Sequence, residues 1–226
     1  MKILFIYPDI FDYAFAKGTF YSGIASISAV LKKETAWNVA LMHLTRSAAR
    51  PIFISQVKEH EPDLIAFSAT TNMYPYVEKW ASWIKEEIEG IKIVCGGAHA
   101  IIDPDDVIQD PNIDIVCIGE GEYPMSELCN MIEKGYAINR IEGLWVKDSG
   151  RVHRNPPRPL IQNLDTLPFP DRDIYDYQNL HYESQGRAAV MLSRGCPYSC
   201  RYCCNEALRK IYNVSTKTYV RFRSVS

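Results

Sequence analysis

The first 135 residues alternate short apolar runs with segments of helical spacing, and this alternation limits the possible folds more than any other feature. Apolar runs with so little polar alternation are typical of strands that helices bury on both faces. Strands that alternate with helices form parallel sheets. The sequence therefore predicts an α/β fold with a doubly wound, five-stranded parallel sheet, Rossmann-like in its layers. The predicted strands lie within residues 2–7, 37–44, 63–70, 91–97 and 113–122.

Helices are predicted between these strands and after the last one. The clearest helical spacing runs from Met73 to Ile88, and Gly90 ends it. Ligands of such sheets bind beyond the carboxyl ends of the strands, so the loops after the strands are the place to expect a site. The other helices are expected over residues 23–33, 52–60 and 124–134.

Composition divides the chain into three parts. Residues 1–135 make up the sheet domain. Residues 136–186 contain a small hairpin with Asp148, Ser149 and Gly150 as its turn, followed by a proline-rich stretch that is typical of an extended linker. Residues 187–226 begin with another apolar strand and are predicted to open a second domain.

Charge and hydropathy argue against two classes of partner. The net charge is −2, and no basic patch marks a nucleic-acid surface. No apolar run approaches the roughly 18 residues that a membrane helix needs. The apolar run at the N-terminus is too short for a signal peptide. We therefore expect a cytoplasmic protein that binds neither nucleic acid nor membranes.

Four of the seven cysteines fall within nine residues, and three of them have the spacing of metal ligands. Cys196, Cys200 and Cys203 form a C-x3-C-x2-C pattern directly after the last predicted strand. Thiolates suit iron–sulfur clusters or zinc. A closed zinc site needs a fourth ligand, and neither cysteine nor histidine follows Cys204. Three thiolates on a [4Fe–4S] cluster would leave one iron open to another molecule, so the cluster is favoured over a zinc-bound tail.

This segment resembles the C-x3-C-x-aromatic-C signature of the radical SAM superfamily, with Tyr202 as the aromatic residue. The resemblance implies that Cys196, Cys200 and Cys203 ligate the cluster and that its open iron binds S-adenosylmethionine. It implies that Tyr202 lies beside the adenine. It also implies reductive cleavage to a 5′-deoxyadenosyl radical, with an electron from a donor such as flavodoxin or ferredoxin. Cys204 matches no ligand position.

The sheet domain lacks the motifs of three other ligand-binding α/β proteins. Gly119 and Gly121 are not followed by the third glycine of a dinucleotide-binding fingerprint. Ser68 stands where a receiver domain has its aspartate. The loop after the first strand is not rich in serine, threonine and glycine, as a flavodoxin-like phosphate loop would be.

Three loops instead resemble, in order, those of the cobalamin-binding domain that precedes many radical SAM enzymes. The resemblance implies that the glycines let the backbone approach the corrin ring and that the hydroxyl side chains line the slot for its nucleotide tail. The residues alone also allow a simpler interpretation as turn glycines and a helix cap. The matching residues are Ser68, Ala69 and Thr70 after the third strand, Gly96, Gly97 and His99 after the fourth, and Gly119, Glu120 and Gly121 after the fifth.

The loop after the first strand departs from the better-known cobalamin domains. Those carry an Asp-x-His-x-x-Gly loop whose histidine coordinates cobalt, whereas this loop has Asp9 and Asp12 but no histidine. The lower cobalt ligand therefore stays open. For His99, a hydrogen bond to the cofactor or to a neighbouring loop is favoured over cobalt ligation, and Glu120 is expected to contact the corrin amides. His43 is interpreted as a polar residue at a strand end.

Taken together, the chain resembles the N-terminal portion of a cobalamin-dependent radical SAM enzyme. The resemblance implies methyl transfer to a small-molecule or peptide substrate, although some relatives catalyse ring contraction or cyclisation. The alternative is a non-enzymatic cobalamin-binding or carrier module with a vestigial cluster site. The resemblance also implies that residues 187–226 are the start of a radical SAM barrel. Only 30 residues follow Cys196, and a barrel takes roughly 200. We therefore expect the reading frame to continue into the rest of the barrel.

Overall fold

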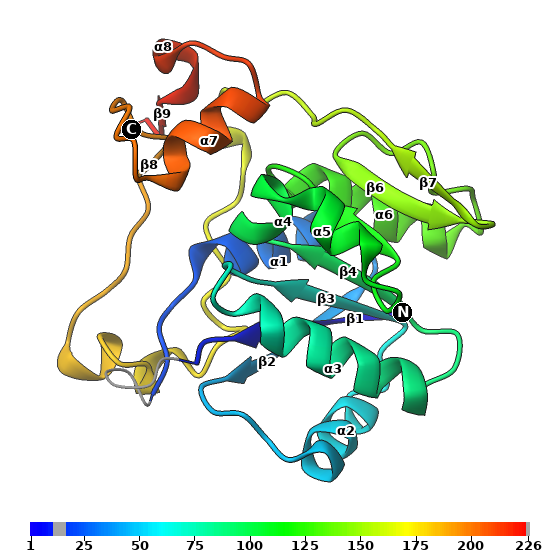
Figure 1. Ribbon diagram of the computed structural model, residues 1–226. Helices are drawn as coiled ribbons and strands as arrows, with labels where there is room; N and C mark the ends of the chain where they lie inside the picture. Colours follow the sequence, from blue (N-terminus) through cyan, green and yellow to red (C-terminus); the bar gives the residue numbers. More distant parts are fainter. Residues whose placement is uncertain (11–16, 225–226) are drawn as a thin grey trace.

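Five parallel strands form the centre of the computed structural model, which describes residues 1–10 and 17–224 (Figure 1). Their order is β2-β1-β3-β4-β5, which is a doubly wound order. The predicted five-stranded parallel sheet is confirmed. These strands are β1 (Lys2–Pro8), β2 (Asn38–Leu44), β3 (Leu64–Ser68), β4 (Lys92–Gly96) and β5 (Ile115–Cys117).

The predicted hairpin adds two antiparallel strands to the same sheet. Strand β6 (Leu144–Asp148) pairs with β5, and β7 (Arg151–Arg154) pairs with β6, so the sheet has seven strands. The turn has positive φ at Ser149 and Gly150, as hairpin turns of this kind require. The hairpin covers the edge of β5, whose backbone groups would otherwise lack partners.

Helices cover both faces of the sheet, and the side-chain alternation of β1 shows why. Ile3 and Phe5 pack in one apolar cluster with α1 and α6, whereas Leu4 and Ile6 pack in the other with α2 and α3. Figure 1 shows α3 in front of the sheet and α1 behind it. The four helices are α1 (Ser22–Glu34), α2 (Arg50–Glu59), α3 (Tyr74–Glu87) and α6 (Glu122–Glu133).

Two further helices, α4 (Ala98–Ile102) and α5 (Pro104–Gln109), follow β4 and were not predicted. Each is too short to show helical periodicity in sequence. Pro104 occupies the first helical position of α5, and the Asp103 side chain accepts a hydrogen bond from the Asp106 N–H at 3.3 Å. These local features fix a helix start that apolar spacing alone does not reveal.

The linker runs along α1. Leu164 and Leu167 pack against Val30, and the Asp171 N–H donates to the Ala25 carbonyl at 2.9 Å. Three short 3₁₀ turns interrupt it, over Leu164–Thr166, Tyr177–Asn179 and Glu183–Gln185.

The segment after the linker contains little regular structure. The strand predicted there is limited to β8 (Ser193–Arg194), which pairs antiparallel with β9 (Arg221–Phe222). The apolar side chains of Val190 and Leu192 are 66% and 65% exposed, so they have no core to define a longer strand. Between β8 and β9 lie α7 (Cys204–Ile211) and α8 (Thr216–Tyr219). No helix among the described residues has the length and apolarity needed to cross a membrane.

Candidate cofactor site

The three loops singled out in the sequence lie at one edge of the sheet. Ser68 ends β3 and pairs in register with Gly96, the last residue of β4. Strand β5 is parallel to β4, so the loop beginning at Gly119 leaves on the same side. Figure 1 shows α7, the helix after the clustered cysteines, above α4 on the side to which β3 and β4 point, and α4 contacts α7. The edge is thus flanked by the cysteine-containing segment.

Gly97 is required where the first two of these loops touch. Its φ of 93° lies in the region that favours glycine, and a Cβ there would come within 2.6 Å of the Ala69 N and O atoms. The Ala69 N–H donates to the Gly96 carbonyl at 3.1 Å, and the Ala69 carbonyl accepts from the His99 N–H at 3.1 Å. The two loops therefore form one rigid, side-chain-poor surface.

The hydroxyl groups of this surface have protein partners. The Ser68 side chain shares a hydrogen bond with the Tyr21 side chain. Burial raises the pKa of Tyr21, and this hydrogen bond opposes the rise. The Thr70 hydroxyl donates to Asn72 Oδ1 at 2.6 Å and is exposed. The two side chains therefore lie at the loop surface without filling it.

His99 is buried and engaged on both ring nitrogens. Nδ1 lies 3.3 Å from the Thr71 hydroxyl, and Nε2 lies 3.3 Å from Asp106 Oδ2. The ring also packs on Tyr74, with centroids 4.3 Å apart. These contacts join α4 to α5 and to the β3 loop, which leaves no free ring nitrogen for a metal. The geometry favours the hydrogen-bonding role over cobalt ligation.

The carboxyl ends of β1 and β2 carry a second histidine. His43 Nε2 lies 2.9 Å from Asp9 Oδ2, and its ring stacks on Tyr7. The Asp9 carboxylate is buried and also accepts from the Thr19 N–H at 2.6 Å. His43 is thus more than a polar strand end, because it partners a buried carboxylate. Asp12 lies outside the described residues.

Glu120 is bound by donors from three other parts of the chain. Its Oε1 accepts from Arg194 at 2.9 Å, and its Oε2 accepts from Arg221 at 2.9 Å and from the Ile161 N–H at 2.8 Å. Burial alone would raise the pKa of Glu120, but the Arg221 hydrogen bond and the two guanidinium charges outweigh burial and lower it. The carboxylate expected to contact the corrin amides therefore has protein partners.

Gly119 and Gly121 flank Glu120 and are tightly packed. Gly119 has a φ of 99°, and a Cβ there would lie 2.3 Å from the Tyr212 hydroxyl, which accepts from the Glu120 N–H at 2.8 Å. A Cβ at Gly121 would lie 2.8 Å from Ile27 Cδ1. Both glycines thus allow close approach, in this structure by protein side chains.

The clustered cysteines lie at the surface, just beyond β8. Among the described residues, no three His, Cys, Asp or Glu side chains are gathered as a metal-binding group. The donor chemistry nevertheless fits a cluster. The backbone and side-chain amides of Asn205 donate to the Cys203 thiol and lower its pKa, which favours the thiolate form that binds metal. Cys200 is exposed, and Cys196 and Cys203 are partly exposed. Tyr202 is 94% exposed.

The other three cysteines differ from these in burial and in the pKa of their thiols. Cys95, Cys117 and Cys129 are buried in the sheet domain, and burial raises the pKa of each thiol, to about 12 for Cys117 and Cys129. These cysteines are structural.

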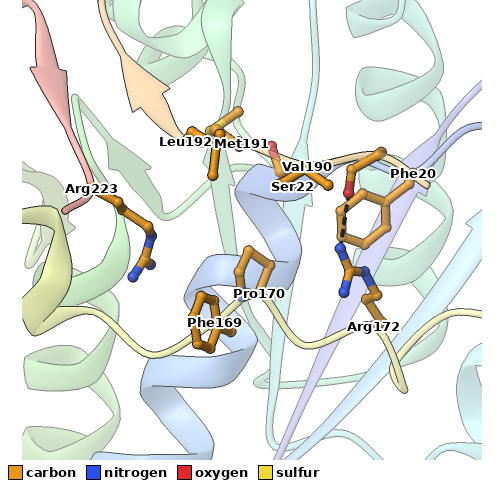
Figure 2. Close-up of a pocket in the computed structure, with 10 residues that line it drawn as sticks. Phe20, Ser22, Phe169, Pro170, Arg172, Val190, Met191, Leu192 and Arg223 are labelled. Carbon is orange, nitrogen blue, oxygen red and sulfur yellow. Dashed lines mark hydrogen bonds between the residues drawn. The ribbon is translucent and has the colours of Figure 1, made fainter. Parts of the chain in front are cut away.

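A surface cavity of about 200 Å³ lies where the linker, the start of α1 and the chain before β8 meet. Figure 2 shows Phe169, Pro170 and Met191 around it. Arg172 donates to the Ala189 carbonyl at 3.0 Å, and Arg223 donates to the Leu167 carbonyl at 3.1 Å. The two arginines bind the linker to the cysteine-containing segment, and none of the predicted site residues lines this cavity.

Sequence reasoning missed Arg194, Arg221 and Tyr212. Arg194 stands two residues before Cys196, and its proximity to the motif was the one available signal. Its partners lie 74 and 72 residues away in sequence, and such distant ion pairs leave no periodic pattern.

Comparisons with known proteins agree with the geometry. A family model, the B12 binding domain, matches residues 19–129. An uncharacterized methyltransferase of Pyrococcus horikoshii is 36% identical over 148 residues, which cover 65% of this chain and 32% of the relative. The anaerobic magnesium-protoporphyrin IX monomethyl ester cyclase of Cereibacter sphaeroides is 26% identical over 223 residues, 95% of this chain and 36% of the relative. The chain thus spans about a third of the length of these relatives.

Solved structures share the fold. The radical S-adenosylmethionine methyltransferase TsrM from Kitasatospora setae aligns with a TM-score of 0.73 and 17% identity, over 99% of this chain and 43% of that one. The cobalamin-dependent S-adenosylmethionine radical enzyme OxsB aligns with a TM-score of 0.67 and 21% identity, over 89% and 28% of the two chains. These structures show the fold alone, whereas the family model and the sequence relatives show that the chain belongs to the family of radical SAM enzymes that contain a cobalamin-binding domain.

Proposed function

We propose that this chain binds cobalamin at the carboxyl edge of its sheet and a [4Fe–4S] cluster on Cys196, Cys200 and Cys203. One observation carries the proposal. The strand that leads into the cysteines is bound, through Arg194, to the loop after β5, so the cysteine segment lies against the edge where ligands of such sheets bind. Two cofactor sites side by side are what a reaction shared between them requires.

The surface formed by the β3 and β4 loops is the proposed floor of the cobalamin site. Gly96 and Gly97 have no side chains that would project from this surface, and Ala69, which is only 3% exposed, packs beneath it. Ser68 and Thr70 supply hydroxyl groups beside a nucleotide tail, and the third loop, with Gly119 and Gly121 packed by Tyr212 and Ile27, would border the site. His99 fixes the β4 loop through its two ring hydrogen bonds. When bound, cobalamin supplies a carrier for a methyl group.

The cysteine loop is proposed to bind the cluster and S-adenosylmethionine. The backbone and side-chain amides of Asn205 donate to the Cys203 sulfur and lower the pKa of this thiol, which favours the metal-binding thiolate. The Tyr202 ring is exposed and can stack on a nucleobase. When bound, S-adenosylmethionine would accept one electron, supplied by a flavodoxin or ferredoxin, and would give methionine and a 5′-deoxyadenosyl radical. This radical would become 5′-deoxyadenosine by taking a hydrogen atom from the substrate.

For the whole protein, we propose methyl transfer to a small-molecule or peptide substrate. The Pyrococcus relative is called a methyltransferase, as is TsrM, and this naming supports the proposal. The cyclase of Cereibacter sphaeroides marks the competing outcome, a ring-forming reaction on the same fold.

A non-enzymatic cobalamin-binding or carrier module is the second candidate. The observation in its favour is that the cysteine side chains are not gathered into a ligand group among residues 1–10 and 17–224. In that case the chain would bind cobalamin and leave S-adenosylmethionine intact.

The test is anaerobic reconstitution with iron and sulfide, followed by electron paramagnetic resonance of the reduced chain with and without S-adenosylmethionine. We expect the cluster signal to change when S-adenosylmethionine is added, and dithionite to yield 5′-deoxyadenosine. The Cys200→Ala variant should lose both responses, and the Cys204→Ala variant should keep them. A cluster signal that ignores S-adenosylmethionine, with no 5′-deoxyadenosine formed, would favour the carrier module.

A further inference from the structure

The segment that carries the cysteines has almost no apolar anchor. Of residues 187–224, only Tyr219 and Arg221 are buried, and α7 buries none of its side chains. The two strands of the segment are two residues long each. Apolar burial is the main force that orders protein segments. Other contacts must therefore fix this segment relative to the sheet domain.

Arg172 and Arg223 bind the segment to the linker, and its ion pairs with the sheet domain converge on two acids. Arg194 lies between them, with Nη1 on Glu120 at 2.9 Å and Nη2 on Glu122. Arg221 contacts the other oxygen of Glu120 at 2.9 Å. The four side chains are between 4% and 18% exposed, so their charges are largely withdrawn from water. Charges this shielded are stable only when paired.

Neutral donors and acceptors complete the network. The Ser26 hydroxyl of α1 donates to Glu122 Oε1 at 2.7 Å and accepts from Arg194 Nη2 at 3.1 Å. Arg221 also donates to the Ile161 carbonyl of the linker at 3.0 Å. The network therefore joins the sheet domain, the linker and the cysteine segment.

The network is rigidly connected to the first cysteine. Arg194 and Arg221 are paired residues of β8 and β9, so the two arginines move together. Gly195 has a φ of 85°, and a Cβ there would lie 2.1 Å from the Tyr219 carbonyl oxygen. The peptide between Arg194 and Cys196 is thus packed against the chain leading into β9. A shift of the arginines would shift Cys196.

One of the acids also lies in a loop of the other proposed cofactor site. Glu120 lies between Gly119 and Gly121, in the loop proposed to approach cobalamin, and Glu122 begins α6. The same two carboxylates thus connect both proposed sites.

We propose that Glu120 and Glu122 form a clamp for Arg194 and Arg221, and that this clamp sets the position of the cluster relative to cobalamin. The four are positioning residues, which act through the loops they join. The distance part of this inference rests on the proposed function, whereas the clamp itself is a property of the protein without cofactors.

The first measurement therefore uses the full chain without cofactors. Hydrogen–deuterium exchange in Glu120→Gln and Arg194→Met should be at least about tenfold faster over residues 189–196 and 219–223 than in the wild type, while β3 and α3 stay protected. Arg194→Lys should restore part of the protection, because a single cation still fits between the acids. The matched control is Glu206→Gln, which breaks an ion pair with Arg209 inside α7 and leaves the clamp intact.

Unchanged exchange in both clamp variants, or an equal rise in Glu206→Gln, would overturn the clamp. If a clamp variant fails to fold, Arg221→Met, which removes the other cation from Glu120, serves in its place with the same expectation. This measurement is independent of cofactor binding, so a chain that binds no cobalamin still tests the clamp.

The second measurement uses the chain with both cofactors reduced to their paramagnetic states. The reduced cluster should broaden and relax the Co(II) signal of cobalamin, and this magnetic interaction depends on the distance between them. In Arg194→Met we expect both cofactors still bound but a weaker interaction, and in Arg194→Lys an intermediate one. Full retention of the interaction in Arg194→Met would overturn the claim that the clamp sets the distance.

Discussion

The sheet domain and the cysteine segment are stabilised by different interactions. The sheet domain encloses two apolar clusters, one on each face, and its own three cysteines are buried thiols with raised pKa. The segment over residues 187–224 buries two side chains, and its cysteines lie at the surface. The comparison teaches that apolar burial defines one region, whereas ion pairs and, we propose, metal ligation define the other.

The strongest test of this comparison is to replace cysteines of each group by alanine and to compare the effects. Replacing Cys196, Cys200 or Cys203 by alanine should remove nearly all cluster iron and sulfide, because an incomplete ligand set does not retain the cluster. The far-ultraviolet circular dichroism should stay unchanged, because none of the three supports the core.

Iron and sulfide analysis after anaerobic reconstitution checks this expectation. The control is Cys129→Ala, which should lower stability and leave the cluster content intact. A full cluster content in any one of the three segment variants would contradict the assigned ligand set.

The same substitution in each region should differ strongly in its effect on stability. Leu4→Ala empties a fully buried site in the interior strand β1, and we expect a loss of about 2–5 kcal/mol in the free energy of unfolding. Leu208→Ala, on the half-buried face of α7, should cost less than about 1 kcal/mol. Urea denaturation of both variants measures the difference, and equal losses would show that the segment shares the core.

Glycines offer a sharper comparison within the sheet domain itself. Gly97→Ala combines an unfavourable φ with a clash at 2.6 Å against the Ala69 backbone, and should cost about 3 kcal/mol or more. Gly90→Ala has a similar φ of 75° but no neighbour within 4 Å, and should cost about 1 kcal/mol. Thermal unfolding of the two variants separates the cost of the steric clash from the cost of a positive φ at a residue with a side chain. An equal cost would mean that the loops yield to the added methyl group.

The smallest effect concerns pH. Burial raises the pKa of Glu120, but Arg221, Arg194 and the Ile161 N–H outweigh burial and lower it. Glu122 shares Arg194 with Glu120, and the Tyr212 hydroxyl accepts from the Glu120 N–H. A carboxylate with a lowered pKa stabilises the folded state above its unfolded pKa, near 4.3, and loses this contribution as the pH falls through its folded pKa.

The stability difference between the wild type and Glu120→Gln should therefore be constant from pH 7 to about pH 5 and shrink at lower pH. We expect it to be on the order of 1 kcal/mol, because the segment buries little surface. Urea unfolding across this range measures it, and a difference that grows on acidification would contradict the lowered pKa.

The sequence revealed those parts of the fold that apolar side chains determine. The five parallel strands and the helix around Trp80 were predicted because their side chains face a core on regular periods. The apolar residues from Val190 to Leu192 gave the same signal but form no long strand, because no core covers them. The place of the β6–β7 hairpin in the sheet was not predictable, because β5 and β6 pair across residues that are far apart in the sequence.

The candidate site was predictable in kind but not in its contacts. The spacing of three cysteines indicated a cluster, because ligand geometry restricts local spacing. The ion pairs of Glu120 were not foreseen, because the partners of a carboxylate are chosen in three dimensions. Its acidic side chain gave no sign of whether a cofactor or an arginine would meet it.

The central claim is that the carboxyl edge of the sheet binds cobalamin, and an anaerobic titration with hydroxocobalamin followed by gel filtration tests it most directly. The account predicts stoichiometric binding that survives the column, with a visible spectrum altered from that of the free cofactor. A well-folded chain that elutes without cobalamin would contradict the account, and methyl transfer would lose its main support.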